Sequence, residues 1–307
     1  MTTDFDFACP ICHAPLETIT PDALRCASDA AVFPRVDGIW RLMRPDRIAH
    51  FARFVKEYEA IRQAEGRGSD NPSYYRALPF ADLTGRMPRD WQIRAASYRA
   101  LESNVIASGR SLKILDLGAG NGWLAYRFAK RGHTVAAVDL LTNGRDGLGA
   151  HVHYDASFTP VQAEFDHLPF AANQFDAVIF NSSFHYSADY AVTLNAAWRV
   201  AKPNGGVVIL DSPIYTRAAS GTAMVREREE QFQHTYGFPS NSLGSENFLT
   251  FQRLDELAAL TKTHWRFVTP WYGWRWALRP WLARVRGQRE PARFVLIIGT
   301  RAAGESN

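Results

Sequence analysis

The sequence predicts an α/β fold with a mostly parallel sheet, and three observations support this prediction. Residues 113–117 read as a short buried strand that runs into a glycine turn at 118–122. A helix with one apolar face follows this turn. A second strand over 133–137 then leads into Asp139. Because a strand, a glycine turn and a helix together form a crevice for a nucleotide-like ligand, the same segment also predicts a cofactor site.

The composition and charge are those of an ordinary globular protein. The chain has 307 residues, 46% hydrophobic and 21% charged, which excludes a fully disordered chain and suits about two folded units. The net charge of +4 is modest, and the basic residues are 30 arginines and 5 lysines, so a nucleic-acid partner is not indicated. No apolar run approaches the ~18 residues of a membrane span, and the acidic start does not resemble a secretion signal. We therefore expect a cytoplasmic protein.

All three cysteines lie in the first 26 residues, where their spacing suggests a metal site. Cys9 and Cys12 form a C-x2-C pair. Cys26 begins a second pair of the same spacing, in which Asp29 takes the place of the fourth thiolate. Three thiolates and a carboxylate can hold a tetrahedral zinc ion, and His13 is a nearby substitute ligand. A ribbon without metal, held together by apolar side chains, is the alternative.

The chain before the first buried strand divides into two parts. Residues 1–45 are predicted to form a small ribbon module, and 46–108 a helical linker or cap. Apolar residues recur at helical spacing over 46–65, and a second helix is predicted over 88–108. We expect these helices to pack across the open face of the core as scaffold, and a substrate lid is the alternative.

The spacing of the glycines indicates which cofactor binds. A dinucleotide fingerprint would need glycine at position 123, where this chain has Trp123. The spacing here is G-x-G-x-G, formed by Gly118, Gly120 and Gly122 after Asp116. This pattern resembles motif I of the class I S-adenosylmethionine-dependent methyltransferases, whose cofactor has no pyrophosphate.

The resemblance continues along the chain in the order that the family shows. Three further segments resemble its later motifs: 162–170, 173–180 and 200–210. The resemblance is close over about 109–212 and rests on pattern alone over 250–301. It implies a Rossmann-like three-layer sandwich with a seven-stranded, mostly parallel sheet whose last strand is antiparallel, within a methyltransferase domain over 109–307.

The same resemblance implies S-adenosylmethionine as the cofactor. By that match Glu164 would face the adenine amino group and the Phe165 N–H a ring nitrogen. Asp139 can accept both hydrogen bonds of a ribose diol, and a helix cap is its alternative role. The expected cofactor residues are Asp116, Gly118, Ala119, Gly120, Gly122, Asp139, Leu140, Glu164, Phe165 and Asn181. The N-terminal segment resembles the zinc ribbons fused ahead of bacterial methyltransferases, so zinc on Cys9, Cys12, Cys26 and Asp29 is the second expected cofactor.

Two late segments suggest contacts beyond the core. The insert 213–249 is polar and rich in glycine, which makes it a candidate lid over the methyl donor. Residues 271–287 combine tryptophan with arginine, a composition that suits peripheral contact with a membrane interface. An aromatic cap on the core or on the substrate pocket is the alternative, and Pro280 interrupts the helix.

The reaction implied by the resemblance is methyl transfer to an O, S or C nucleophile of a small molecule. His185, which follows the fourth core strand, could serve as general base, and a packed histidine is the alternative. No Asn-Pro-Pro-Tyr or Asp-Pro-Pro-Tyr motif follows that strand, which disfavours methylation of amino groups on bases or glutamine. An RNA methyltransferase and a non-catalytic cofactor-binding module are the alternative functions. The acceptor and the oligomeric state are left open.

Overall fold

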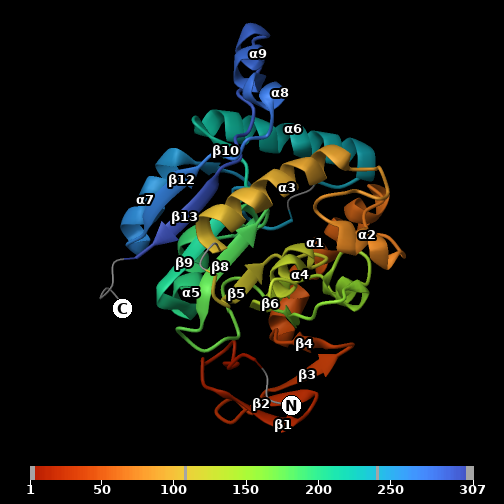
Figure 1. Ribbon diagram of the computed structural model, residues 1–307, viewed down its shortest axis with the longest axis vertical. Helices are drawn as coiled ribbons and strands as arrows, with labels where there is room; N and C mark the ends of the chain where they lie inside the picture. Colours follow the sequence, from red (N-terminus) through yellow and green to blue (C-terminus); the bar gives the residue numbers. More distant parts are fainter. Residues whose placement is uncertain (1–3, 107–108, 240–241, 302–307) are drawn as a thin grey trace.

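A single eleven-stranded sheet runs through the molecule (Figure 1). The computed structural model describes residues 4–106, 109–239 and 242–301. Along the sheet the strand order is β1-β2-β3-β4-β7-β6-β5-β8-β9-β13-β12. A separate parallel pair is formed by β10 (Ile214–Tyr215) and β11 (Leu249–Thr250).

The middle of the sheet consists of five parallel strands. These are β7 (Thr159–Gln162), β6 (Thr134–Asp139), β5 (Lys113–Leu117), β8 (Phe175–Asn181) and β9 (Ala201–Leu210). Two antiparallel strands follow β9, namely β13 (Leu296–Thr300) and then β12 (His264–Val268). Because parallel strands end at one edge, the residues after β5, β6 and β8 meet there.

The N-terminal strands extend this sheet, which corrects the predicted count of seven strands to eleven among the described residues. The four strands are β1 (Leu16–Thr20), β2 (Ala23–Cys26), β3 (Val32–Val36) and β4 (Ile39–Arg41). β4 pairs in parallel with β7, with Trp40 opposite Val161. This pairing covers the edge that β7 would otherwise leave open, which avoids unpaired backbone groups there.

Helices cover both faces of the sheet, and two apolar cores result. Leu115 and Leu117 of β5 pack in one core, together with Leu194 of the helix that follows β8. Ile114, on the opposite side of the same strand, packs in the other core with Leu124. This alternation is the side-chain period of a strand buried on both faces, and it confirms the predicted layered α/β fold.

The sequence predicts some of the α-helices, with different ends, and misses others. The α-helices are α1 (Pro45–Ala64), α2 (Pro72–Ala77), α3 (Pro88–Leu101), α4 (Trp123–Ala129), α5 (Tyr190–Val200), α6 (Ala218–Tyr236), α7 (Phe251–Thr261), α8 (Trp274–Ala277) and α9 (Arg279–Val285). The first three begin with proline, whose fixed φ and missing N–H suit the first helical position. The predicted helix over 88–108 ends at Leu101, and a π-helical turn continues to Ile106. Residues 107–108 lie outside the described part.

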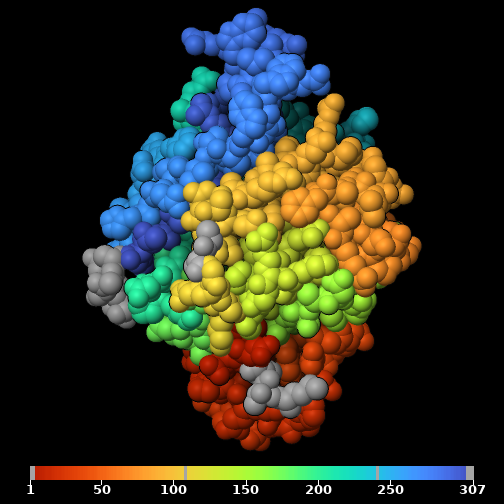
Figure 2. Space-filling view, in the orientation of Figure 1, coloured from red at the N-terminus to blue at the C-terminus, as the bar shows by residue number. Residues whose placement is uncertain are grey.

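The late segments lie at one end of the molecule. In Figure 1 α6 passes above the sheet beside α3, and α8 and α9 project beyond it. Figure 2 shows the same projection as a narrow knob opposite the N-terminal strands. No helix in the described ranges is both long and apolar enough to cross a bilayer.

Candidate active site

A cavity of about 450 Å³ opens at the edge where the parallel strands end. Its wall includes residues that directly follow β5, β6 and β8, among them Gly118, Leu140 and Ser182. Helices α1, α3 and α6 supply the remaining sides. The position is the one that ligands occupy in open parallel sheets.

The glycine turn after β5 has a backbone that other residues would not tolerate. The N–H groups of Gly118 and Ala119 both donate to the Val138 carbonyl of β6, at 2.8 and 3.0 Å. Gly118 has a φ of +74°, and a side chain there would overlap Ser183. Gly122 has a φ of +80°, and its added Cβ would lie 2.5 Å from the Phe158 ring. Both positions therefore require glycine, which keeps the backbone open to a ligand.

Asp139 connects the second strand to this turn. Its Oδ2 accepts from the Gly120 N–H at 2.7 Å, and its Oδ1 accepts from the Leu141 N–H at 2.8 Å. Burial raises the pKa of Asp139 to about 6 in spite of these two hydrogen bonds. The carboxylate lines the cavity, and each oxygen retains a lone pair for a further donor.

The ten predicted cofactor residues divide into two groups. Residues that line the cavity are Gly118, Ala119, Gly120, Asp139, Leu140, Glu164, Phe165 and Asn181. Asp116 and Gly122 do not line it. Asp116 is fully buried in the strand, and burial raises its pKa to about 8. Asp116 lies within β5 and Gly122 closes the turn, whereas the other eight residues line the space that a ligand would fill.

Asn181 is the clearest sign that the cavity is built for a polar ligand. It ends β8 and is 6% exposed. Its Oδ1 is buried without a hydrogen-bond partner among the described residues, although it belongs to a cavity-lining side chain. A buried acceptor left unpaired costs free energy, so a ligand donor is the expected partner.

Glu164 lies on the cavity wall and is paired with a cation that the sequence did not suggest. Arg47 of α1 donates to both of its carboxylate oxygens, at 2.6 to 3.0 Å. The Arg47 guanidinium also lies over the Phe51 ring at 5.1 Å. The adenine contact expected of Glu164 would therefore involve a carboxylate that is already held in place.

His185 is buried beside the cavity and is not one of its lining residues. It belongs to a short 3₁₀ turn, Phe184–Tyr186, that follows β8. Its Nδ1 lies 3.2 Å from the Ser212 hydroxyl, and its ring packs on Tyr186 at 4.3 Å. Burial, with a smaller effect from Arg228, lowers the pKa of His185 to about 3. The imidazole is therefore neutral near pH 7.

Sequence reasoning missed most of the cavity's remaining wall. Phe51, Phe54 and Tyr58 of α1 line it, so α1 is more than the expected scaffold. Their helical spacing was visible in the sequence, but spacing does not reveal what the apolar face meets. Arg94 of α3 and Arg228 of α6 also line the cavity, and no sequence pattern singled them out.

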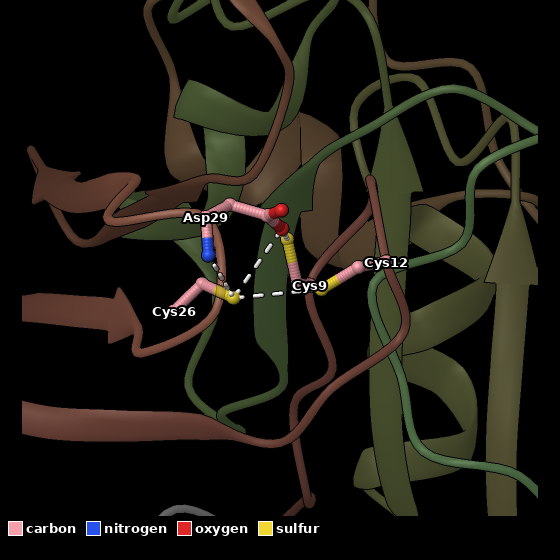
Figure 3. A group of neighbouring side chains, drawn as sticks. All are labelled: Cys9, Cys12, Cys26 and Asp29. Carbon is pink, nitrogen blue, oxygen red and sulfur yellow. Dashed lines mark hydrogen bonds between the residues drawn. The ribbon is translucent and has the colours of Figure 1, made fainter.

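The predicted metal ligands come together within the N-terminal strands. Cys9, Cys12, Cys26 and Asp29 point toward one another in Figure 3. Their ligand atoms all lie within 4.8 Å of each other, with Cys9 Sγ 3.1 Å from Asp29 Oδ2. The backbone N–H groups of Ile11 and Asp29 point at sulfur atoms at 3.4 Å. Among the described residues, these four side chains form the group that could hold a metal ion, and His13 is not part of it.

The chemistry of this donor set suits zinc. Three sulfurs and one carboxylate oxygen can give the four-coordinate arrangement of a structural site. The C-x2-C turn is held by the His13 N–H donating to Cys9 O at 2.9 Å, so two of the sulfurs are positioned by the backbone itself. Cys9 and Cys26 are buried, whereas Cys12 and Asp29 are exposed.

The central part of the chain is similar to known proteins. Residues 115–209 match the family described as "Methyltransferase domain". The chain is 33% identical over 111 residues to the ubiquinone/menaquinone biosynthesis C-methyltransferase UbiE of Vibrio cholerae, covering 32% of this chain and 40% of that protein. It is 28% identical over 131 residues to the malonyl-[acyl-carrier protein] O-methyltransferase of Erwinia pyrifoliae, covering 40% and 47%. The chain thus spans less than half the length of these curated relatives.

Solved structures give weaker matches. The S-adenosylmethionine-dependent methyltransferase of Mesorhizobium loti matches with 18% sequence identity and a TM-score of 0.48, over 69% of this chain and 98% of that one. The family match covers the glycine turn, Asp139 and Asn181. Residues 115–209 therefore resemble a methyltransferase domain.

Proposed function

With a methyltransferase domain over residues 115–209 as the premise, we propose that the protein is an S-adenosylmethionine-dependent methyltransferase acting on a small molecule. The observation that carries the proposal is the convergence of the glycine turn, Asp139 and Asn181 on one cavity. When bound, this cofactor supplies a methyl group on a sulfonium, which is already an activated electrophile. The acceptor nucleophile is an oxygen, sulfur or carbon atom.

The residues present fit the proposed cofactor. Asp139 would accept from the ribose hydroxyls, and the unpaired Oδ1 of Asn181 would accept from a donor of the ligand. Glu164 and the Phe165 backbone would meet the adenine. The amino-acid end would lie over the open backbone at Gly120, where an added Cβ meets only the Asp146 carbonyl at 3.6 Å.

The chain's own contribution to the reaction is alignment. Holding donor and acceptor in one orientation can supply several kcal/mol of the barrier reduction. Residues of the 213–249 insert, namely Arg228, Phe232 and Leu243, line the cavity, which supports the predicted lid. The assignment of His185 as general base stays a prediction, because the side chain is buried beside the cavity rather than on its wall.

Calorimetric titration tests the proposed function. S-adenosylmethionine and its demethylated product should bind, and NAD should not, because the turn lacks the third glycine of a dinucleotide site. Binding without turnover across a broad acceptor panel would favour a non-catalytic module. Salt-dependent retention of RNA would favour an RNA methyltransferase. Binding of NAD in place of S-adenosylmethionine would contradict the proposal.

Zinc is the second cofactor that we propose, bound by Cys9, Cys12, Cys26 and Asp29. The support is the mutual distance of the four ligand atoms, 4.8 Å at most. Its role would be structural, because it would tie the turn after Cys9 to the end of β2. No step of methyl transfer is assigned to it.

Peripheral contact with an anionic membrane through residues 271–287 is also proposed. Trp271, Trp274 and Trp281 are 73%, 63% and 62% exposed, on the projection formed by α8 and α9 (Figure 1). Arg275, Arg284 and Arg286 are exposed in the same segment, and residues 271–289 contain no acidic residue. Indoles and arginines of this kind favour the headgroup region of a bilayer. The exposed tryptophans do not support the alternative of a buried aromatic cap.

Sedimentation with lipid vesicles tests the membrane contact. We expect binding to vesicles that contain phosphatidylglycerol and weaker binding to pure phosphatidylcholine. The variant Trp274→Ser/Trp281→Ser should bind less, whereas Leu260→Ser, at an exposed position on α7, should bind as the parent does. Equal sedimentation of parent and double variant would exclude this contact. Cytoplasmic location also stays a prediction.

A further inference from the structure

The cavity is lined by five arginines, and three of them are neutralised by carboxylates. Arg47 pairs with Glu164 at 2.6 Å. Arg62 pairs with Asp146, and Arg67 with Glu65 at 2.5 Å. The first two pairs join α1 to other parts of the cavity wall, and the third lies within the loop after α1. Their charges are already balanced within the chain, so they do not call for a charged ligand.

The two remaining arginines have no such partner. Arg94 makes no ion pair or hydrogen bond within the described ranges, and its guanidinium lies over the Trp91 ring at 5.2 Å. Asp211 is close enough to influence Arg94 electrostatically but does not form an ion pair with it. Burial, together with Arg62 and Arg67, lowers the pKa of Arg94, and Asp211 partly offsets this effect.

Arg228 is similarly unsatisfied. Its Nη2 donates to Asn247 Oδ1 at 2.7 Å, which is a neutral acceptor. Its Nε is buried and has no hydrogen-bond partner among the described residues. Both residues are half-buried, and neither forms an ion pair among the described residues, so an anionic ligand is a partner that would satisfy both.

An aromatic wall accompanies these two cations. Phe54, Tyr58 and Tyr186 form a cluster with ring centroids 5.5 to 6.1 Å apart, and all three line the cavity. Phe51 of α1 and Phe232 of α6 also line it. Such a surface suits an apolar or planar ligand body, since aromatic rings bury well against each other.

We propose that the methyl acceptor is an anionic molecule whose carboxylate or phosphate is bound by Arg94 and Arg228 and whose apolar body lies against the aromatic wall. This inference rests on the proposed methyltransferase function and specifies its substrate class. The guanidinium fork matches the oxygens of both anions. Arg94 and Arg228 come from α3 and α6, whereas the proposed cofactor residues Asp139 and Asn181 come from β6 and β8.

The test is calorimetric titration of the protein saturated with S-adenosylhomocysteine. The probes are benzoate, phenyl phosphate and the neutral isostere benzamide. At least one anion should bind about tenfold or more tightly than benzamide, since hydrogen bonds to charged groups contribute ~1.5–3 kcal/mol. The anion that binds more tightly shows whether the acceptor carries a carboxylate or a phosphate.

Matched variants show whether these arginines are responsible. Arg94→Gln and Arg228→Gln should each lower the affinity for the anion about tenfold or more and leave that for benzamide unchanged. Arg89→Gln on α3 and Arg226→Gln on α6 are the controls, because both residues are exposed and neither lines the cavity. Thermal melting checks that all four variants are folded.

Three results would overturn the inference. The first is equal binding of anions and benzamide, and the second is absence of binding by every anion. The third is a loss of S-adenosylhomocysteine affinity in Arg94→Gln or Arg228→Gln with anion binding intact, which would assign the arginines to the cofactor's carboxylate. All three leave the proposed function standing. Failure of the parent protein to bind S-adenosylhomocysteine would count against the proposed function itself.

Discussion

Arg47 holds both carboxylate oxygens of Glu164 across 117 residues of sequence, with three hydrogen bonds of 2.6 to 3.0 Å. Glu164 is 6% exposed, and His167 Nδ1 lies 3.1 Å from its Oε1 on the other side. The pair fastens the start of α1 to the segment after β7. The first helix of the cap is thereby docked on the expected adenine end of the cavity.

Removing this cation should destabilise the protein. We expect Arg47→Gln to lower the free energy of unfolding by ~1–3 kcal/mol, because the buried Glu164 carboxylate loses its counter-charge. Arg226→Gln, on α6, breaks a pair with Glu230 in which both side chains are exposed, and should cost less than ~1 kcal/mol. Denaturant unfolding measures both. Equal losses in the free energy of unfolding would show that the Arg47–Glu164 pair stabilises the protein no more than an exposed pair does.

Cofactor affinity should depend on pH through Asp139. Burial raises its pKa to about 6 in the free protein, and the ionised form is the one that can accept from two ribose hydroxyls. Affinity for S-adenosylmethionine should therefore be constant above about pH 7 and fall as pH drops through about 6, because a proton must first be released.

The variant Asp139→Asn is the control for this pH dependence. It should bind more weakly at pH 7.5 and lose the decline between pH 7 and 5, since its side chain does not titrate in that range. Calorimetric titrations of both proteins across this range make the measurement. A decline of the same size in the variant would assign the effect to another group.

Substitution of His185 distinguishes a role in base catalysis from a role in packing. Its burial and its contacts with Ser212 and Tyr186 lead us to expect that His185→Ala lowers the melting temperature and the cofactor affinity together. Since its pKa is lowered to about 3, the ring is neutral from pH 5 to 8 and should impose no fall in rate there. Single-turnover methyl transfer, cofactor titration and thermal melting are the measurements.

A different result would establish the sequence-based assignment of His185. Turnover reduced by ~10²–10⁴ with unchanged cofactor affinity and melting temperature is what loss of a general base produces. The packing account is contradicted by that outcome.

The metal site predicts a stoichiometry. Protein purified without chelators should contain about one equivalent of zinc, and Cys26→Ala should lose it. Asp22→Asn, an exposed substitution in the same group of strands, should retain it. Elemental analysis gives the count, and a lower melting temperature after chelation should accompany metal removal. Parent protein free of zinc would leave the ribbon to its apolar packing alone.

Local patterns made one side of the cavity predictable. The G-x-G-x-G turn, its φ values and the position of Asp139 depend on residues close in sequence, and the parallel pairing of β5 with β6 brings them together. Asn181 was predictable for the same reason, since it ends a strand that the periodicity identified.

Distant contacts could not be predicted in this way. The pairing of Trp40 with Val161, and of Arg47 with Glu164, joins segments more than 100 residues apart, and no local spacing encodes it. Nor does the sequence show that Arg94 and Arg228, from two different helices, line one cavity. His185 follows Asn181 by four residues, yet a 3₁₀ turn directs its ring into the protein interior.

The central claim is that the glycine turn binds S-adenosylmethionine, and a paired titration tests it most directly. Gly120 and Gly132 both have positive φ, +55° and +82°, and neither has an atom within 3.4 Å of an added Cβ. Backbone strain from arginine is therefore similar at the two positions, but only Gly120 lines the cavity. Calorimetry should show S-adenosylmethionine binding to the parent and to Gly132→Arg and none to Gly120→Arg. Undiminished binding by Gly120→Arg would contradict the account.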